Sequence, residues 1–171
     1  MATGLLTTIW ISLTLFVVGE FGKRRPGAGA FWWAAAAGLA LGVVHVFFAL
    51  YINDDWDHAV AWRVTEARTR EMFGFGWGGL VAGNYAFLAF WGIDLWRWRR
   101  DPAAYAATPP LVVWGSRAFV LGIIAPAAIV FAAGPRRWLG VVLVGAMIAS
   151  WLAGRDGTSF ATNRGGRART K

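Results

Sequence analysis

Two histidines, His45 and His58, are the only imidazoles in this chain of 171 residues, which contains no cysteine. Imidazole binds haem iron and divalent metals, and it carries protons near neutral pH. His45 lies in the apolar run GVVHVFFALY, and His58 follows the acidic break INDDWDH. One interpretation is therefore a b-type haem with His45 as an axial ligand, for which His58 or Met147 would supply the second donor.

The acidic break offers a second kind of site. Asp54, Asp55 and Asp57 stand beside His58, and carboxylates with an imidazole bind divalent cations. Their spacing matches neither HxxxH nor ExxH, and a helix cap with solvated charges accounts for them equally well. We therefore predict no metal site here.

Asn84 is the polar residue of a third apolar run, GWGGLVAGNYAFLAFWGIDLW. Trp77 and Trp91 share a helical face with it, so these side chains line a cavity for a planar ligand such as a quinone, or they form core packing. The remaining interpretation of the histidines is structural: His45 hydrogen-bonds across helices to Asn84 or Tyr85.

Charged residues mark a second polar region. Arg117 stands within an apolar run, where a carboxylate partner relieves the cost of its charge, and Asp94 is the partner that we predict. Glu20 belongs to the same region and has Lys23 as its i+3 neighbour. The group is interpreted as a structural ion pair or, alternatively, as a path for protons or anions.

The elements that must position these residues are transmembrane helices. Hydrophobic residues make up 57% of the chain and charged residues 15%, against about a quarter charged in a soluble domain. A hydrocarbon core of about 30 Å requires about 20 helical residues. The apolar runs predict an all-α bundle of five spans within residues 1–154, at 4–21, 31–52, 73–96, 110–133 and 138–153.

A short amphipathic helix is predicted between the second and third spans. It covers residues 56–71, with Asp54 or Asp55 as its cap and an apolar stripe suited to the membrane interface. Basic residues gather after the first, third and fifth spans, which predicts an N-terminus outside and a cytoplasmic C-terminus in a bacterial inner membrane. Residues 155–171 are predicted to be a disordered basic tail.

Small residues mark the predicted helix contacts. Ala34, Gly38 and Gly42 recur every four residues along the second span, on the face that carries His45, and Gly79 and Gly83 form a GxxxG pair in the third. Such faces let helices approach closely. We therefore expect the two sets to pack against each other.

The pattern HVFFALY…DDWDHAVAW…GWGG…GNYAFLAFWGIDLW, with the later turn GPRRWLG, resembles small, uncharacterised multi-pass membrane proteins of bacteria. The similarity covers about residues 44–96. It implies a membrane bundle and carries no functional residue over to this chain.

No GxSxG, P-loop or dinucleotide-binding motif occurs in the sequence, which argues against an autonomous enzyme. The formal charge of +8 sits in loops beside the predicted spans, which fits lipid headgroups and gives no reason to expect nucleic acid. The sequence favours a non-catalytic subunit or scaffold that associates with itself or with other membrane chains. A haem- or quinone-binding redox bundle and a small transporter or proton-conducting protein remain as alternatives.

Overall fold

The computed structural model describes residues 2–23 and 28–153. All regular secondary structure in these residues is helical, which confirms the all-α prediction. The predicted tail of residues 155–171 lies outside the described residues. The elements are α1 (Ala2–Gly22), α2 (Gly29–Asp54), α3 (His58–Phe73), α4 (Leu80–Arg100), α5 (Pro102–Ala106), α6 (Pro110–Ala125), the π-helical turn η1 (Pro126–Val130) and α7 (Pro135–Ala153).

Four segments in the described part of the chain are long and apolar enough to cross a membrane: Gly4–Gly22, Gly29–Asp54, Pro110–Val130 and Pro135–Ala153. They support an α-helical membrane protein. The remaining predicted span, at residues 73–96, is not confirmed by this criterion. Its helix, α4, has the same length as α1, but its second half carries Asp94 and three arginines.

A glycine-rich stretch moves the start of α4 well beyond the predicted boundary at residue 73. Gly74 adopts φ 77° and ends α3, a conformation that glycine adopts without steric cost. The chain becomes helical again only after Gly79. Trp77 and Gly79 therefore precede the helix in which the sequence pattern had placed them.

The cap of α3 also differs from the prediction. Asp55 and Trp56 adopt positive φ values of 50° and 65°, and this left-handed pair ends α2. The chain turns there, so the carboxylate that caps α3 belongs to Asp57, which accepts a hydrogen bond of 2.7 Å from the N–H of Ala59. The predicted caps Asp54 and Asp55 are wrong, because Asp54 ends α2, Asp55 belongs to the left-handed turn after it, and α3 begins only at His58.

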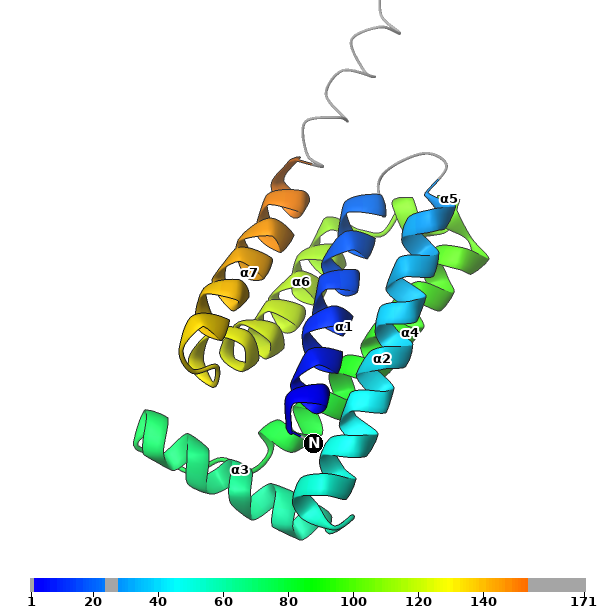
Figure 1. Ribbon diagram of the computed structural model, residues 1–171. Coiled ribbons are helices and arrows are strands. Elements are labelled where there is room, and N and C mark those ends of the chain that lie inside the picture. Colours follow the sequence, from blue (N-terminus) through cyan, green and yellow to red (C-terminus); the bar gives the residue numbers. More distant parts are fainter. Residues whose placement is uncertain (1, 24–27, 154–171) are drawn as a thin grey trace, which may run out of the picture.

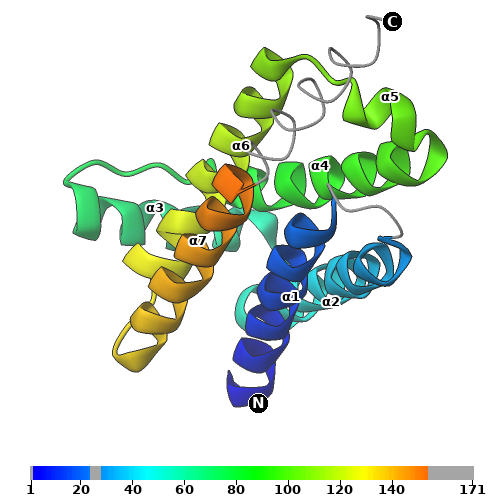
Figure 2. The ribbon, with the colours of Figure 1, turned by 90° about the horizontal axis from the view of Figure 1, so that it is seen from above.

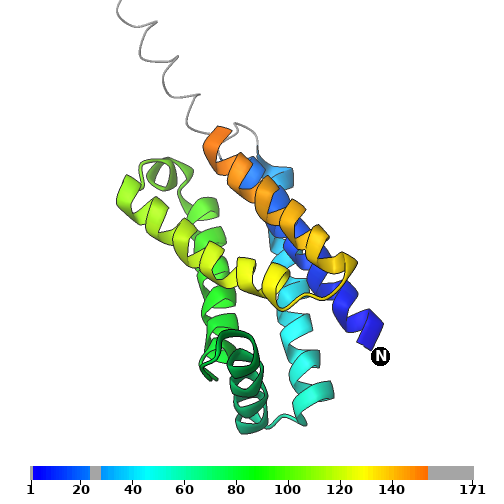
Figure 3. The same cartoon turned by 90° about the vertical axis from the view of Figure 1, so that its left-hand side faces the viewer.

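The bundle consists of α1, α2, α4, α6 and α7, while α3 lies across one end of it and α5 is at the opposite end (Figure 1). Viewed from above, α1 lies between α2 and α7 (Figure 2). Figure 3 shows α6 crossing α4 steeply and continuing through η1 to the first turn of α7. We refer to the two ends of the bundle as the α3 end and the α5 end.

Aromatic side chains fill the centre of the bundle between α1 and α4. Phe16 contacts Phe87 and Trp91 edge-on, with ring centroids 5.6 Å and 4.8 Å away. Trp91 is 2% exposed and Met147 of α7 is fully buried. Trp91 is thus a core residue, the more ordinary of the two roles that its position in the sequence allowed.

The small residues of α2 pack against α1, which differs from the contact expected from the sequence. A side chain at Gly38 would meet Ser12 and Leu15 of α1 as well as Trp91, and Gly42 also faces Ser12. Ala34 is half-buried beside this contact. Gly83 instead lies against Ile123 of α6, and Gly79 against the ring of Trp77. The small residues of α2 thus pack against α1, the helix that precedes α2 in the chain, where Ser12 faces both Gly38 and Gly42.

Candidate functional site

A cluster of ionised and hydrogen-bonded side chains closes the α5 end of the bundle. The ammonium group of Lys23 lies 2.5 Å from Oδ2 of Asp94 and also forms an ion pair with Glu20. The Tyr105 hydroxyl donates to Oδ1 of Asp94 at 2.9 Å, and Nε1 of Trp151 donates to Oε2 of Glu20 at 2.7 Å. We call these five residues the Lys23 cluster. It joins α1, α4, α5 and α7 in one network.

Charge compensation within the Lys23 cluster fixes the protonation of its members. Burial by itself lowers the pKa of Lys23, but the carboxylates of Glu20 and Asp94 outweigh this effect and raise that pKa well above its usual value. Burial raises the pKa of the Tyr105 hydroxyl, and the Asp94 carboxylate adds to the increase, while the Lys23 ammonium opposes it. At neutral pH the cluster therefore holds a charged lysine and a neutral tyrosine.

The partner of Asp94 in this cluster is not the one that the sequence suggested. Lys23 and Tyr105 occupy its two carboxylate oxygens. The guanidinium of Arg117 lies over the rings of Trp114 and Trp151, at 4.7 Å and 5.4 Å from their centroids. Arg117 thus joins the edge of the cluster through Trp151. The i+3 pairing of Glu20 with Lys23 is confirmed.

The two histidines have separate surroundings. Nδ1 of His45 lies 2.9 Å from the carbonyl oxygen of Leu5 and 3.2 Å from Oγ1 of Thr8. His45 therefore links α2 to α1, and the expected partners Asn84 and Tyr85 are wrong, because this face of α2 is turned toward α1. The ring of His58 lies 5.9 Å from that of Tyr85.

Metal-binding geometry is absent from the described residues, in which no three His, Asp or Glu side chains converge. In the acidic break, Asp57 is used as the cap of α3 and the neighbouring side chains face solvent or the interface.

A cavity opens at the α3 end, centred on Asn84. It has two adjoining lobes with volumes of about 210 Å³ and 270 Å³. The lobes share Asn84 of α4, Ile123 of α6, Ala127 of η1 and Phe131. We call the whole space the Asn84 cavity, its smaller part the α3 lobe and its larger part the α1 lobe.

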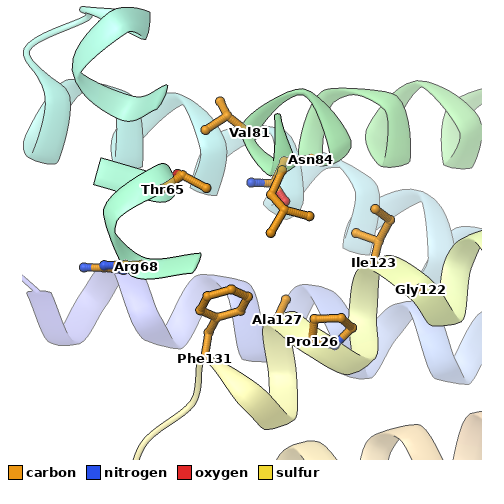
Figure 4. Close-up of a pocket in the computed structure, with 10 residues that line it drawn as sticks. Thr65, Arg68, Val81, Asn84, Gly122, Ile123, Pro126, Ala127 and Phe131 are labelled. Atoms are coloured by element: carbon orange, nitrogen blue, oxygen red, sulfur yellow. The ribbon is translucent and has the colours of Figure 1, made fainter. Parts of the chain in front are cut away.

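The α3 lobe is lined by three polar side chains, those of Thr65, Arg68 and Asn84. Figure 4 shows the Asn84 amide directed into the space between α3 and the α6–η1 segment, with Thr65 on the opposite wall and the Phe131 ring below. Arg68 lies at the rim, with its guanidinium directed away from Asn84 (Figure 4). The α3 lobe thus combines two polar side chains, Asn84 and Thr65, and one charged residue, Arg68, with an otherwise apolar lining.

The α1 lobe is lined mainly by apolar side chains. Its walls come from one face of α1 and from the α6–η1 segment, and its lining is Leu6, Ile9, Trp10, Leu13, Asn84, Phe87, Ile123, Ile124, Ala127, Ala128, Phe131, Ala132, Ala133 and Arg136. Arg136, on the first turn of α7, is the single charged residue in that lining. A hydrocarbon body fits this chemistry.

The shape of the backbone explains why this space is open. Pro126 lacks an N–H group, and the helix widens from α to π geometry at this residue. The segment carries alanines at positions 127 and 128, which fill little volume. Farther along α1, by contrast, Phe16 and Trp91 fill the gap to α4. π-Helical turns occur frequently at functional sites.

Asn84 is exposed in the cavity. No residue in the described part of the chain forms a hydrogen bond with its side-chain amide, whereas every buried side-chain nitrogen or oxygen of that part has a partner. A polar group among largely apolar walls is suited to hold the polar end of a small molecule. This amide is therefore the strongest single pointer to a ligand.

Sequence reasoning found the centre of the cavity and missed its rim. Asn84 was predicted as a ligand-binding residue and lines both lobes, but His45, His58 and Trp77 line neither. Trp77 lies in the turn after α3, where its backbone N–H donates to Oγ1 of Thr69. Arg68 and Arg136 were counted only as loop charges. The signal that could have pointed to them is Pro126 in the apolar run 110–133, because the helix changes to π geometry there and Phe131, just beyond it, contacts Phe73 at the end of α3.

Comparisons with models of protein families, with curated proteins and with solved structures found no match for this chain.

Proposed function

We propose that this chain is a non-catalytic membrane protein that binds a small apolar molecule through the Asn84 cavity. The observation that carries the proposal is the Asn84 amide, which is exposed in a largely apolar space and has no hydrogen bond to the described residues. Small-molecule sites orient a ligand with a few polar groups in mainly hydrophobic surroundings. A ligand with an oxygen atom at this position would bond to the Asn84 amide.

The lining agrees with this class of ligand. Binding sites for small molecules combine mainly hydrophobic walls with a few convergent polar groups. The α1 lobe supplies the hydrophobic walls, and Asn84 with Thr65 supplies the polar groups in the α3 lobe. The ligand class is an apolar body with one hydrogen-bonding end, and a quinone is one member of it.

The proposal includes a topology of five spans, with α4 as the third. Twenty-one helical residues extend about 31 Å, enough for the hydrocarbon core. The charges that lower the apolarity of α4 are all in its second half, where Asp94 joins the Lys23 cluster and Arg97, Arg99 and Arg100 form the last turn. Such residues suit the headgroup level.

We further propose that the α5 end faces the cytoplasm of a bacterial inner membrane. Lys23 and the three arginines that end α4 gather at that end, in keeping with the positive-inside rule. The amphipathic helix α3 and the Asn84 cavity then face the periplasmic side. A ligand would enter from the outer leaflet.

A haem centred on His45 has less support than a ligand in the Asn84 cavity. His45 lines neither lobe, and its Nδ1 is engaged with Leu5 and Thr8 of α1. A transporter role through Arg117, Asp94 and Glu20 has less support too, because the two carboxylates are already paired within the Lys23 cluster.

A role as subunit or scaffold is the second candidate, favoured by an aromatic surface on α2. Phe47, Phe48 and Tyr51 are 54%, 45% and 53% exposed, and Trp56 packs on Phe47 with ring centroids 4.5 Å apart. This surface suits either lipid or another membrane chain. Association with a second chain is compatible with ligand binding, because the cavity lies elsewhere.

The test is native mass spectrometry of the full chain released from mild detergent. Wild type is expected to carry a bound small molecule, which an organic extract of the same sample identifies. Ala127→Phe places a ring where the two lobes meet and should remove the adduct. Leu111→Phe, at a residue of α6 that is 85% exposed, is the control and should retain it. A bare chain mass for well-folded wild type, or an adduct that survives Ala127→Phe, would overturn the proposal.

A further inference from the structure

We infer that the ligand of the Asn84 cavity is an anionic single-chain amphiphile, with its phosphate or carboxylate head between Arg68 and Arg136 and its chain in the α1 lobe. This inference rests on the proposed function and specifies the chemistry of the ligand. Its starting point is the charge of the lining. Each lobe contains one charged residue, an arginine in both cases, and no carboxylate lines either lobe.

The two arginines are available for an anion. Neither Arg68 nor Arg136 forms an ion pair with another residue in the described ranges 2–23 and 28–153, and both side chains are exposed. Neighbouring basic residues are used differently. Arg70 pairs with Glu66 at 2.7 Å, and Arg137 donates to the carbonyl oxygens of Ile129 and Ala132 at the end of η1.

The fold places the two arginines in adjoining lobes. Figure 1 shows the C-terminal part of α3, which carries Arg68, facing the turn that leads into α7, and Arg136 follows in the first turn of α7. A ring contact joins these segments, since Phe73 and Phe131 have centroids 6.2 Å apart. Phe131 lines both lobes. Arg68 and Arg136 thus line the two lobes that adjoin at Phe131, and the guanidinium of Arg68 is directed away from Asn84 (Figure 4).

This arrangement matches the two parts of an amphiphile. Arginine forms paired hydrogen bonds with phosphate and carboxylate oxygens, and these charge-assisted bonds are stronger than neutral ones. Below the rim, Asn84 is placed to bond an ester or hydroxyl oxygen next to the head. Leu6, Ile9 and Leu13 of α1 then surround the chain. A neutral ligand would leave both guanidinium groups without a counter-charge at the membrane interface.

The experiment measures binding to the full-length protein in nanodiscs of phosphatidylcholine. Three probes divide the ligand into its parts: palmitoyl lysophosphatidic acid carries chain and phosphate, monopalmitin carries the chain alone, and glycerol 3-phosphate carries the head alone. We expect the first to bind at least tenfold more tightly than the second, and the third to show no saturable binding.

Variants assign the preference to the two arginines. Arg68→Gln and Arg136→Gln should each weaken lysophosphatidic acid binding about tenfold and leave monopalmitin binding unchanged. Arg63→Gln, an exposed arginine of α3 outside the lining, is the matched control and should have no effect. A loss that is equal for Arg63→Gln would show only that membrane surface charge attracts the probe, and would overturn the inference.

The outcomes distinguish failure of the anionic-ligand inference from failure of the proposed binding function. Equal affinity for lysophosphatidic acid and monopalmitin, with both lost in Ala127→Phe, would overturn the anionic head and keep the cavity as a binding site. Binding of neither probe above the level seen with Ala127→Phe would overturn both. Saturable binding of glycerol 3-phosphate alone would point to a soluble anion and overturn the amphiphile.

Discussion

The two ends of the bundle treat polar side chains in opposite ways. At the α5 end, Glu20, Lys23 and Asp94 are only 10–13% exposed, and each bonds to another member of the cluster. At the α3 end, Asn84 is exposed in a cavity and forms no hydrogen bond within the described residues. Buried polar networks rigidify a structure only when every member is satisfied. The α5 end therefore contributes to stability, and the α3 end retains an unmet bonding capacity that the proposed ligand would use.

Side-chain volume separates the two ends as clearly as polarity does. Toward the middle of the bundle, Phe16 and Trp91 fill the space between α1 and α4. Toward the α3 end, alanines of η1 face aliphatic residues of α1 across an open lobe. Protein interiors are normally close-packed. A cavity kept open beside an unpaired amide is a departure that a binding function explains and a purely structural role does not.

The two ends should differ most in how much stability is lost when the cation of an ion pair is removed. Lys23→Met leaves two buried carboxylates without their counter-charge, which should lower the free energy of unfolding by about 3–5 kcal/mol. Arg70→Met removes the cation of the exposed Arg70–Glu66 pair and should cost no more than about 0.5 kcal/mol. Thermal unfolding in mild detergent measures both.

Rescue distinguishes loss of charge from loss of packing at Lys23. Lys23→Met combined with Asp94→Asn removes one of the two stranded carboxylates and should recover part of the stability. Equal, small losses for Lys23→Met and Arg70→Met would show that the α5 end is no more firmly held than an exposed loop.

The wall of the cavity provides the next largest effect. A Cβ atom at Gly140 of α7 would overlap the carbonyl group of Ala128 in η1, which cannot yield as a flexible side chain does. Gly140→Ala should therefore destabilise the protein by about 3 kcal/mol. Gly145→Ala is the matched control on the same helix, because a Cβ there meets nothing within 4 Å. It should be neutral or stabilising by up to about 1 kcal/mol.

A loss in both alanine variants would indicate that glycine is needed for helix flexibility, and the close α7–η1 contact would not be the cause. A loss in Gly140→Ala alone would show that this contact holds the π-helical turn in place, and with it the width of the α1 lobe. Thermal unfolding of the two variants side by side decides between these results.

How far the sequence predicts this molecule depends on the range of the interaction involved. The apolar runs predicted the positions of α1, α2, α7 and the combined α6–η1 segment to within a few residues, because burial in lipid is a local requirement. The start of α4 was predicted too early, since apolar aromatic residues among glycines between α3 and α4 look like a helix by composition. Gly74 adopts a left-handed conformation that ends α3, so the apolar residues after it do not continue the helix.

Contacts between helices were harder to predict than the helices themselves. Asp94 was assigned to Arg117 on the next helix in the chain, whereas its cation, Lys23, comes from the end of α1. Asn84 was recognised because a polar residue within an apolar run is visible in any sequence. The rim arginines were not, because the π-helical turn at Pro126 and the placement of α3 are properties of the folded bundle.

A smaller effect, with a pH dependence of defined sign, is expected at Tyr105. Tyr105→Phe removes a hydrogen bond to a charged group and should lower the free energy of unfolding by about 1.5–2 kcal/mol at pH 7. Tyr51→Phe, at an exposed tyrosine of α2, is the control and should leave it unchanged. Equal losses would show that the Tyr105–Asp94 bond makes no special contribution.

The sign of the pH effect follows from both raised pKa values. The pKa of Lys23 and that of Tyr105 are raised in the folded protein, and unfolded lysine and tyrosine lose their protons near pH 10. The cluster's contribution is therefore constant below about pH 10 and declines above it, because the unfolded chain releases these protons first. Unfolding measured from pH 7 to 11 should show this decline, and Tyr105→Phe should make it shallower. A decline on the acidic side alone would contradict the assignment.

The smallest effect is expected from comparing a polar side chain that has a hydrogen bond, in the middle of the bundle, with Asn84, because the two changes in stability should have opposite signs. Ser12→Ala removes a buried hydroxyl that donates to the carbonyl oxygen of Gly38 at 2.7 Å, and should cost about 0.6–1.7 kcal/mol. Asn84→Leu removes an amide that lacks such a bond, so the stability of the ligand-free protein should be unchanged or higher by about 1 kcal/mol. Binding should fall in Asn84→Leu and persist in Ser12→Ala. Residues kept for function commonly lower stability. Only a binding role for Asn84 predicts that its substitution leaves stability intact and weakens binding, while Ser12→Ala does the reverse. If Asn84→Leu instead destabilises the ligand-free protein more than Ser12→Ala, Asn84 is a structural residue, and the two ends of the bundle do not differ in kind.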